Sequence, residues 1–203
     1  MAVACVVLDD KEVAKLIELG VRDSKTLSPR GRELLAEEIK ALSTAFKVVL
    51  VPPSEIDKAV AMKGLNKLEA RIMASLIDDL MPDVAYVDAS DVDETRFALM
   101  INAYLRSRQG VRIVAEHGAD AKYPIVSAAS ILAKVERDGA ISRLREELGI
   151  DFGSGYPTDP KTIAFLRSWY AEHGSYPPFV RRSWKTAKEI AAELGTRKLD
   201  EWG

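Results

Sequence analysis

The stretch Asp120-Ala-Lys-Tyr-Pro124-Ile-Val-Ser127-Ala-Ala-Ser130-Ile-Leu-Ala-Lys134-Val-Glu-Arg-Asp138 decides the fold of this 203-residue chain. Pro124 suits the first turn of a helix, where its missing N–H costs nothing, so a helix is predicted from there to about Leu148. This helix is apolar on nearly every side and should therefore be mostly buried. Steps of three and four residues put four polar residues on one face: Ser127, Ser130, Lys134 and Asp138. A polar stripe in a core needs partners or a site, which makes it a first candidate for chemistry.

The segments on either side of this helix alternate between strands and helices. Short apolar runs predict strands at Ala2–Leu8, Phe46–Val51, Val84–Val87 and Arg112–Ala115. Helical periodicity predicts helices at Lys11–Leu19, Pro29–Leu42, Leu65–Leu80, Thr162–His173 and Trp184–Leu194, and another that reaches about Arg106. Ser28 should cap the second of these, Ser54 a short helix, and Asp91 with Glu94 should form a capping box. The pattern indicates an α/β domain with a mixed or parallel sheet and a helical C-terminal region.

Composition indicates a soluble globular protein, with 47% hydrophobic and 30% charged residues. The apolar run at the N-terminus is too short for a membrane span and has no basic leader. The single Cys5 can form no intramolecular disulfide, which agrees with a reducing compartment and argues against a cysteine-based metal site. We therefore expect a cytoplasmic protein that does not bind membranes and is a monomer.

Charge gives two different indications. The net charge of −2 does not suggest a polyanionic partner. Residues 20–32, however, carry four basic side chains against one acidic, and residues 161–190 carry six against two. Such segments could flank a phosphate backbone, or they could simply be solvated faces.

Two aspartates are the strongest candidates for chemistry. Asp88 stands just past the carboxyl end of a predicted strand, where α/β sheets place reactive groups, although strand-end aspartates are often turn or cap residues. Asp138 ends the polar stripe, although it could also be a surface charge. Together they offer the oxygen ligands that Mg²⁺ or Mn²⁺ takes in proteins. His117 and His173 have no second ligand at metal spacing, and no Ser–His or Cys–His spacing supports a nucleophilic triad.

Five sequence blocks resemble, in chain order, the archaeal branch of the ribonuclease HII family. They are Val21–Ser28, Ala85–Ala89, Ala119–Asp138, Phe152–Pro160 and Arg181–Thr186. The resemblance implies a ribonuclease-H-like fold, with a mixed five-stranded sheet flanked by helices. Residues 1–150 would form the catalytic core, and residues 151–203 a helical substrate-binding region packed on it.

The resemblance also implies an activity and its residues. The enzyme would hydrolyse the RNA strand of RNA–DNA hybrids and cut 5′ to ribonucleotides embedded in duplexes, by two-metal-ion catalysis with Mg²⁺ or Mn²⁺, as expected for a role in DNA replication and repair. Asp88 and Asp138 would be two of four metal-binding catalytic carboxylates. Tyr156 would stack against a deoxyribose. The remaining nucleic-acid contacts would come from Lys25, Lys185, Arg181 and Ser127.

Two further expectations concern the ends of the chain. The family's first strand carries an Asp-Glu pair followed by a Gly-(Arg/Lys)-Gly loop, and we expect this chain to begin after them, with that strand missing. The alternative function is therefore a catalytically inactive hybrid-binding protein. At the other end, Lys198–Trp202 resembles a sliding-clamp tail motif without its leading Gln or second aromatic residue. It could equally be a frayed terminus.

Overall fold

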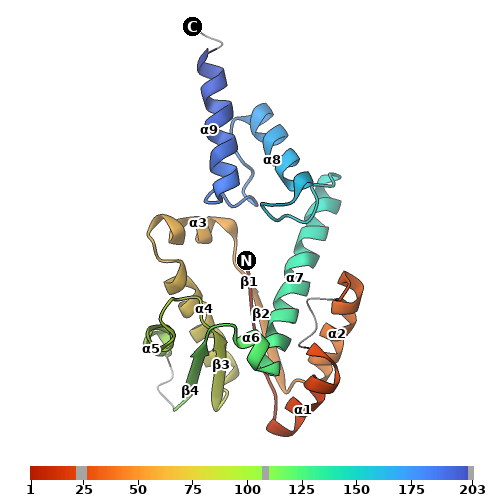
Figure 1. The fold of residues 1–203 in the computed structure, drawn as a ribbon, viewed down its shortest axis with the longest axis vertical. Coiled ribbons are helices and arrows are strands. Elements are labelled where there is room, and N and C mark those ends of the chain that lie inside the picture. The colour runs from red at the N-terminus through yellow and green to blue at the C-terminus, as the bar shows by residue number, and fades with distance from the viewer. Residues whose placement is uncertain (22–26, 107–109, 201–203) are drawn as a thin grey trace. The chain divides into compact units, whose positions relative to one another are not determined.

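The structure is a computed structural model that describes residues 1–21, 27–106 and 110–200, the side chains of 196–200 excepted. Its elements, in chain order, are β1 (Ala2–Val7), α1 (Asp10–Glu18), α2 (Pro29–Leu42), β2 (Ala45–Leu50), α3 (Pro53–Ala61), α4 (Leu65–Leu80), β3 (Val84–Asp88), α5 (Glu94–Tyr104), β4 (Arg112–Glu116), α6 (Ala119–Lys122), α7 (Pro124–Leu148), α8 (Pro160–His173) and α9 (Lys185–Asp200) (Figure 1).

The four predicted strands are confirmed, and so are the helices with strong local signals. Ser28 caps α2 by accepting a hydrogen bond from the Gly31 N–H at 3.1 Å. Pro124 begins α7, and α4 has the predicted bounds. In these segments a cap, a proline or a regular apolar period sits within a few residues of the boundary it determines.

Two predicted caps are wrong. The N-cap of α3 is Pro52, because Pro53 already occupies the first helical position, so Ser54 lies inside the helix. The N-cap of α5 is Asp93, whose carboxylate accepts from the Arg96 N–H at 2.9 Å, and Asp91 has other partners. The short α6 was not predicted, and α9 continues six residues beyond Leu194.

The strands form two pairs. β1 and β2 are antiparallel, with Ala4 opposite Val48, while β3 and β4 are parallel, with Asp88 opposite Glu116. Among the described residues no ladder joins one pair to the other. The strands are therefore mixed in direction, as predicted, but they are divided between two two-stranded sheets.

The chain divides into two compact units. The N-terminal unit contains Ala2–Leu50 and Gly64–Arg137, and the C-terminal unit contains Val51–Lys63 and the described residues from Asp138 onward, together with Met1. This division does not coincide with the predicted boundary at residue 150. The assignment of residues 151–203 to substrate binding stays a prediction.

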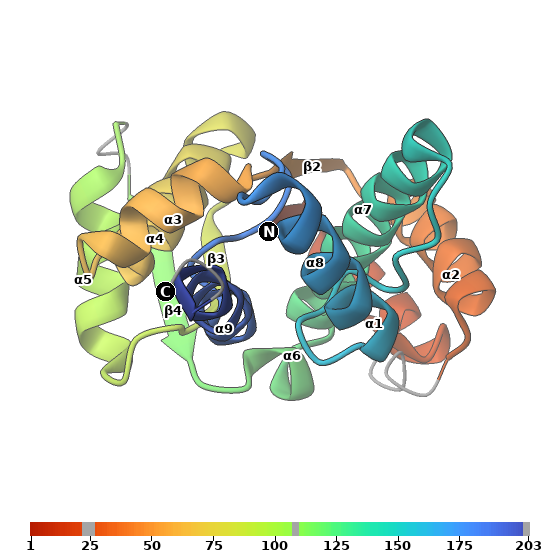
Figure 2. The same ribbon diagram turned by 90° about the horizontal axis from the view of Figure 1, so that it is seen from above.

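The N-terminal unit has two apolar clusters. The buried face of α7 packs against β1, α1 and α2, and α2 lies beside α7 in both views (Figures 1 and 2). The fully buried members of this cluster include Leu16, Val21, Ile39 and Ile131. The second cluster joins α4 and α5 to one face of β3 through residues such as Ala74, Val87, Phe97 and Ile101. This second cluster fixes the strand that ends at Asp88.

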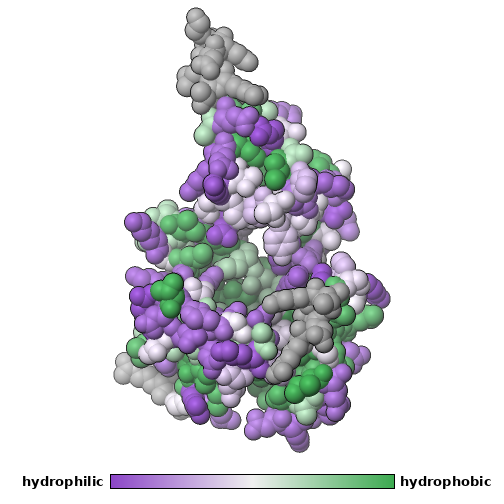
Figure 3. Space-filling view, viewed as in Figure 1, coloured by the Kyte–Doolittle hydropathy of each residue, from purple (hydrophilic) through white to green (hydrophobic). Residues whose placement is uncertain are grey.

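In the C-terminal unit, α8 packs against α9 around Leu166, Val180, Ala187 and Ile190. The buried Tyr176 hydroxyl donates to the Ala187 carbonyl at 2.8 Å. On the face shown in Figure 3, hydrophobic residues are interspersed among hydrophilic ones. No helix in the described part of the chain is long and apolar enough to cross a membrane.

Ser127→Ala should lower the free energy of unfolding by about 1–3 kcal/mol, because it leaves a buried carbonyl without its donor. The Ser127 hydroxyl donates to the Val21 carbonyl at 2.7 Å, and both residues are buried. Ser130→Ala is the matched control, since Ser130 is exposed one turn further along α7 and its loss should cost less than about 0.5 kcal/mol. Urea unfolding of both variants measures the difference, and equal effects would show that the Ser127 bond contributes nothing.

Candidate active site

Asp88 is the last residue of β3, and its exposed side chain lies at the carboxyl end of the parallel strand pair. Its Oδ1 accepts a hydrogen bond from the Ala119 N–H at 3.1 Å. Among the described residues, the other carboxylate oxygen accepts no hydrogen bond. The backbone therefore orients this carboxylate and leaves one oxygen available to a ligand.

Glu116 stands opposite Asp88 in the ladder but is bound on both oxygens. The Tyr123 hydroxyl donates to Oε1 and the Lys122 ammonium to Oε2, each at 2.5 Å. The Lys122 hydrogen bond and then that of Tyr123 lower the pKa of Glu116, while the same bonds raise the pKa values of Lys122 and Tyr123. Glu116 is therefore charged and fully engaged at neutral pH, which suits a structural role beside Asp88.

Asp91 organises the loop that follows Asp88. Its carboxylate, only 4% exposed, accepts from the Arg96 guanidinium, the Asp93 N–H at 3.0 Å and the Asn66 amide at 3.1 Å. The Arg96 hydrogen bond, followed by those of Asp93 and Asn66, lowers the pKa of Asp91 to about 2. The segment between β3 and α5 is thus tied to both α4 and α5.

The loop between β4 and α7 is tied to the same edge. Glu94 accepts from the His117 N–H at 2.6 Å, and the Ala89 N–H donates to the Glu116 carbonyl at 3.0 Å. Glu94 and Glu116 were not predicted to be near Asp88. A signal was available for Glu116, because it directly follows the predicted strand Arg112–Ala115 and the carboxyl ends of parallel strands meet at one edge.

Asp138 lies on α7 and is half-buried; it belongs to the C-terminal unit, whereas Asp88 belongs to the N-terminal one. Across the described ranges, no group of three His, Cys, Asp or Glu side chains converges as a metal cage would require. Mg²⁺ does not need such a cage, since it is commonly held by one or two carboxylates together with waters and substrate phosphate. The open oxygen of Asp88 fits that mode of binding.

The other predicted site residues differ in their exposure and in their polar contacts. Tyr156 is 45% exposed. Lys185 is exposed at the start of α9, 3.6 Å from Glu189, and the Arg181 guanidinium donates to the Ser183 hydroxyl at 3.2 Å. Ser127 is only 4% exposed with its hydroxyl bound to Val21, so it suits packing and not the predicted nucleic-acid contact. Lys25 lies outside the described residues.

Structures of similar fold are ribonucleases. The crystal structure of ribonuclease H2 from Pyrococcus horikoshii OT3 superposes with a TM-score of 0.84 at 39% identity, over 96% of this chain and 99% of that one. The ribonuclease HII of Archaeoglobus fulgidus, solved as a complex with PCNA, gives 0.82 at 44% identity, over 93% and 88%. The α/β fold, shared with these ribonucleases, places the chain in the class of ribonuclease-H-like nucleases.

The sequence comparisons narrow this class to one family. The family model described as Ribonuclease HII matches residues 1–187. Ribonuclease HII of Pyrococcus furiosus is 46% identical over 200 residues, which are 98% of this chain and 87% of the relative. The chain therefore belongs to the ribonuclease HII family, hydrolases that cut the RNA strand of RNA–DNA hybrids as endonucleases. This membership confirms the predicted family and enzyme class and does not favour the alternative of an inactive hybrid-binding protein.

The depressed pKa of Asp91 gives a prediction about pH. A carboxylate with a folded-state pKa of about 2, below its ordinary value of 3.8, contributes stability above pH 4 that is lost as the pH falls toward 2. Asp91→Asn should therefore be less stable than the original protein at pH 6, and the gap should narrow as the pH falls from 4 to 2. Thermal unfolding of both proteins across this range measures the gap. A gap that is constant with pH would contradict the role of the charge.

Proposed function

We propose that this protein cuts the phosphodiester bond 5′ to ribonucleotides, both in RNA–DNA hybrids and in duplexes with embedded ribonucleotides, with Mg²⁺ or Mn²⁺ as its cofactor. The observation that carries the proposal is Asp88, an exposed carboxylate at a strand end, held by a backbone N–H on one oxygen and open on the other. The membership of the chain in the ribonuclease HII family indicates the class of reaction.

Asp88 and Asp138 are the residues proposed to hold the metal. Carboxylate oxygens are the donors that Mg²⁺ and Mn²⁺ prefer. When bound in such sites, the ions supply an activated water and stabilise the leaving 3′-oxygen. The protein's own contribution at Asp88 is orientation, because the Ala119 N–H fixes the carboxylate and the buried Val87 anchors the strand behind it.

Tyr156, Arg181, Lys185 and Lys25 are the residues proposed to hold the nucleic acid. In the C-terminal unit, Asp57 of α3 supports this role, since its carboxylate accepts from the N–H groups of Arg182 at 2.9 Å and Ser183 at 3.0 Å. These bonds fix the turn that carries Arg181 and leads into α9, which begins at Lys185. Cations on a fixed turn bind a phosphate backbone with less loss of conformational entropy than cations on a free one.

Asp88→Asn should reduce hybrid cleavage by more than about 100-fold, because a metal ligand contributes several kcal/mol to transition-state stabilisation. The melting temperature should hardly change, since the amide oxygen can still accept from the Ala119 N–H. Asp83→Asn, the same change in an exposed residue just before β3, is the matched control and should keep full activity. Cleavage of a duplex with one ribonucleotide, measured with Mg²⁺ and with Mn²⁺, tests both variants. Retained cleavage by Asp88→Asn would refute the assignment.

A sliding clamp is the proposed protein partner, bound through the C-terminal tail Lys198–Trp202. The support is the resemblance of this tail to clamp-binding motifs, together with the A. fulgidus relative, which was solved as a complex with PCNA. The side chains of this tail, and Glu201 and Trp202 as a whole, lie outside the described residues.

Ending the chain after Arg197 should abolish binding to an archaeal sliding clamp, because it removes the motif without removing any described buried residue. Hybrid cleavage in the absence of clamp should be unchanged. Size-exclusion co-elution with the purified clamp measures binding, and a steady-state cleavage assay is the control. If the shortened chain still co-elutes with the clamp, another surface binds it.

A further inference from the structure

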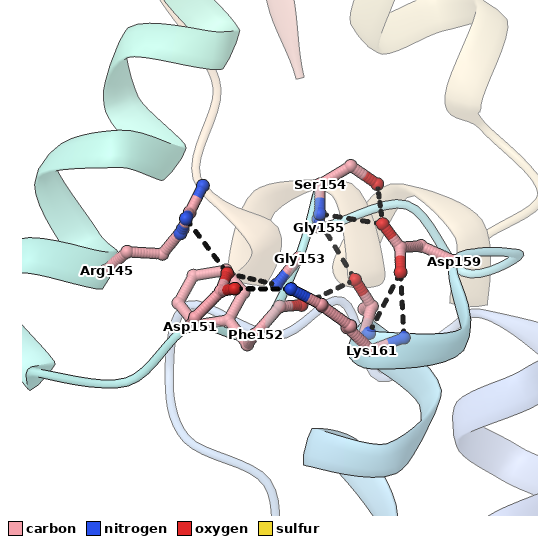
Figure 4. Close-up of polar contacts among 9 residues, drawn as sticks. Arg145, Asp151, Phe152, Gly153, Ser154, Gly155, Asp159 and Lys161 are labelled. Carbon is pink, nitrogen blue, oxygen red and sulfur yellow. Dashed lines mark hydrogen bonds and ion pairs between the residues drawn. The ribbon is translucent and has the colours of Figure 1, made fainter.

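The loop from Asp151 to Asp159 joins α7 to α8 and carries Tyr156. Figure 4 shows the polar contacts that hold residues 151–155 of this loop to Asp159 and the start of α8. Its three consecutive backbone N–H groups, of Gly153, Ser154 and Gly155, all donate to acceptors within the protein. They bind Asp151 Oδ1 at 3.2 Å, Asp159 Oδ2 at 2.8 Å and Thr162 Oγ1 at 3.0 Å. Glycine-rich loops that cradle phosphate leave such N–H groups free for the anion. This loop uses them to hold its own shape.

Asp159 is the main acceptor for the loop. One carboxylate oxygen accepts from the Ser154 N–H at 2.8 Å and the Ser154 hydroxyl at 2.5 Å. The other accepts from the N–H groups of Lys161 at 2.8 Å and Thr162 at 3.4 Å. One side chain therefore caps α8 and at the same time fastens the loop to the first turn of that helix. These hydrogen bonds, led by that of the Ser154 hydroxyl, lower the pKa of Asp159 to about 2.

The segment on each side of Tyr156 is fixed as well. Before it, the Thr162 hydroxyl donates to the Phe152 carbonyl at 2.9 Å, and the Phe152 ring is buried against Phe165. After it, the Thr186 hydroxyl donates to the Pro157 carbonyl at 3.3 Å. The Asp159 N–H closes the turn on the Tyr156 carbonyl at 3.1 Å. The backbone at Tyr156 is thus held while its side chain remains 45% exposed.

Gly153 shows how closely the loop approaches the carboxylate. Its φ is +78°, and a Cβ built there would lie 2.8 Å from both carboxylate oxygens of Asp159. A side chain at this position would push the loop away from its acceptor. The glycine therefore makes room for the Asp159 carboxylate.

We propose that Asp159 is a positioning residue for substrate binding, which holds loop residues 153–157 so that the Tyr156 ring is presented to a sugar of the nucleic acid. The inference rests on the proposed role of Tyr156. A ring on a fixed loop loses little conformational entropy when it stacks, whereas a ring on a loose loop loses much of its binding energy to ordering. Asp159 acts only through Tyr156 and touches no reacting atom.

A double-mutant cycle tests this inference. Asp159→Asn places an amide NH₂ where a carboxylate oxygen accepts from N–H groups, so the loop should loosen. We expect the KM for a hybrid duplex to rise about 10-fold while kcat stays nearly constant, since binding geometry and not chemistry is disturbed. In a Tyr156→Ala background the same change should alter KM less than about 2-fold, because the residue it positions is gone. The loss of melting temperature should be equal in both backgrounds.

Two further variants complete the design. Thr162→Val, of nearly the same shape, removes a second acceptor of the loop, the one that binds the Gly155 N–H. It should show the same dependence on Tyr156, which keeps the test valid if Asp159→Asn fails to fold. Asp78→Asn is the matched control: Asp78 accepts from the Arg106 N–H at 2.9 Å and its guanidinium at 3.2 Å, and neither bond involves a residue of the loop. It should lower the melting temperature and leave KM unchanged.

The outcomes separate this inference from the proposed function. A KM effect of Asp159→Asn that vanishes in the Tyr156→Ala background supports the positioning role. A KM effect of equal size in both backgrounds overturns the positioning role alone, provided that Tyr156→Ala itself raises KM. If Tyr156→Ala leaves KM unchanged, the proposed role of Tyr156 fails and the positioning role fails with it.

Discussion

Hydrogen bonds from backbone N–H groups to aspartate side chains fix the segments around three candidate site residues, Asp88, Tyr156 and Arg181. Asp88 accepts from Ala119, Asp91 from Asp93, Asp57 from the turn before α9, and Asp159 from the Ser154 loop and the first turn of α8. A charged acceptor forms a shorter and stronger bond to N–H than a neutral one. It can also bind two segments at once, as Asp159 does. Loops without regular structure thereby gain fixed positions.

The number of donors on each carboxylate separates structural acids from the candidate reactive one. Asp91 and Asp159 have pKa values lowered to about 2, and a search for perturbed groups alone would single them out as functional. Their shifts are fully explained by donors from the protein on both oxygens. Glu116 is engaged in the same way beside Asp88. A carboxylate with an oxygen left over can take a ligand, and Asp88, at the carboxyl end of β3, is such a carboxylate.

The sequence predicted those features whose causes are local. The Ser28 cap, the proline start of α7 and the position of Asp88 each follow from a few neighbouring residues. It could not predict features that depend on distant partners. Ser127 was expected to face the substrate, but it bonds to Val21, a residue 106 positions away. Asp91 was expected to cap α5, but its carboxylate binds Asn66 of α4. The N-cap of α5 is instead Asp93, an aspartate two residues further along the chain. The division of the strands into two pairs is equally a matter of distant partners.

The polar stripe of α7 shows why spacing alone does not define a site. Ser127, Ser130, Lys134 and Asp138 share a face by helical period, yet Ser127 is buried, Ser130 is exposed, and Lys134 and Asp138 are half-buried. Burial along a helix depends on what packs against each turn, and the apolar cluster on α7 ends near Leu132. The side chains of this stripe therefore differ in exposure from one helical turn to the next. Its buried end needs an internal acceptor, as Ser127 has, and only its exposed and half-buried residues can reach a ligand. The half-buried Asp138 is therefore accessible to a metal ion, whereas the buried Ser127 is not accessible to the nucleic acid it was predicted to contact.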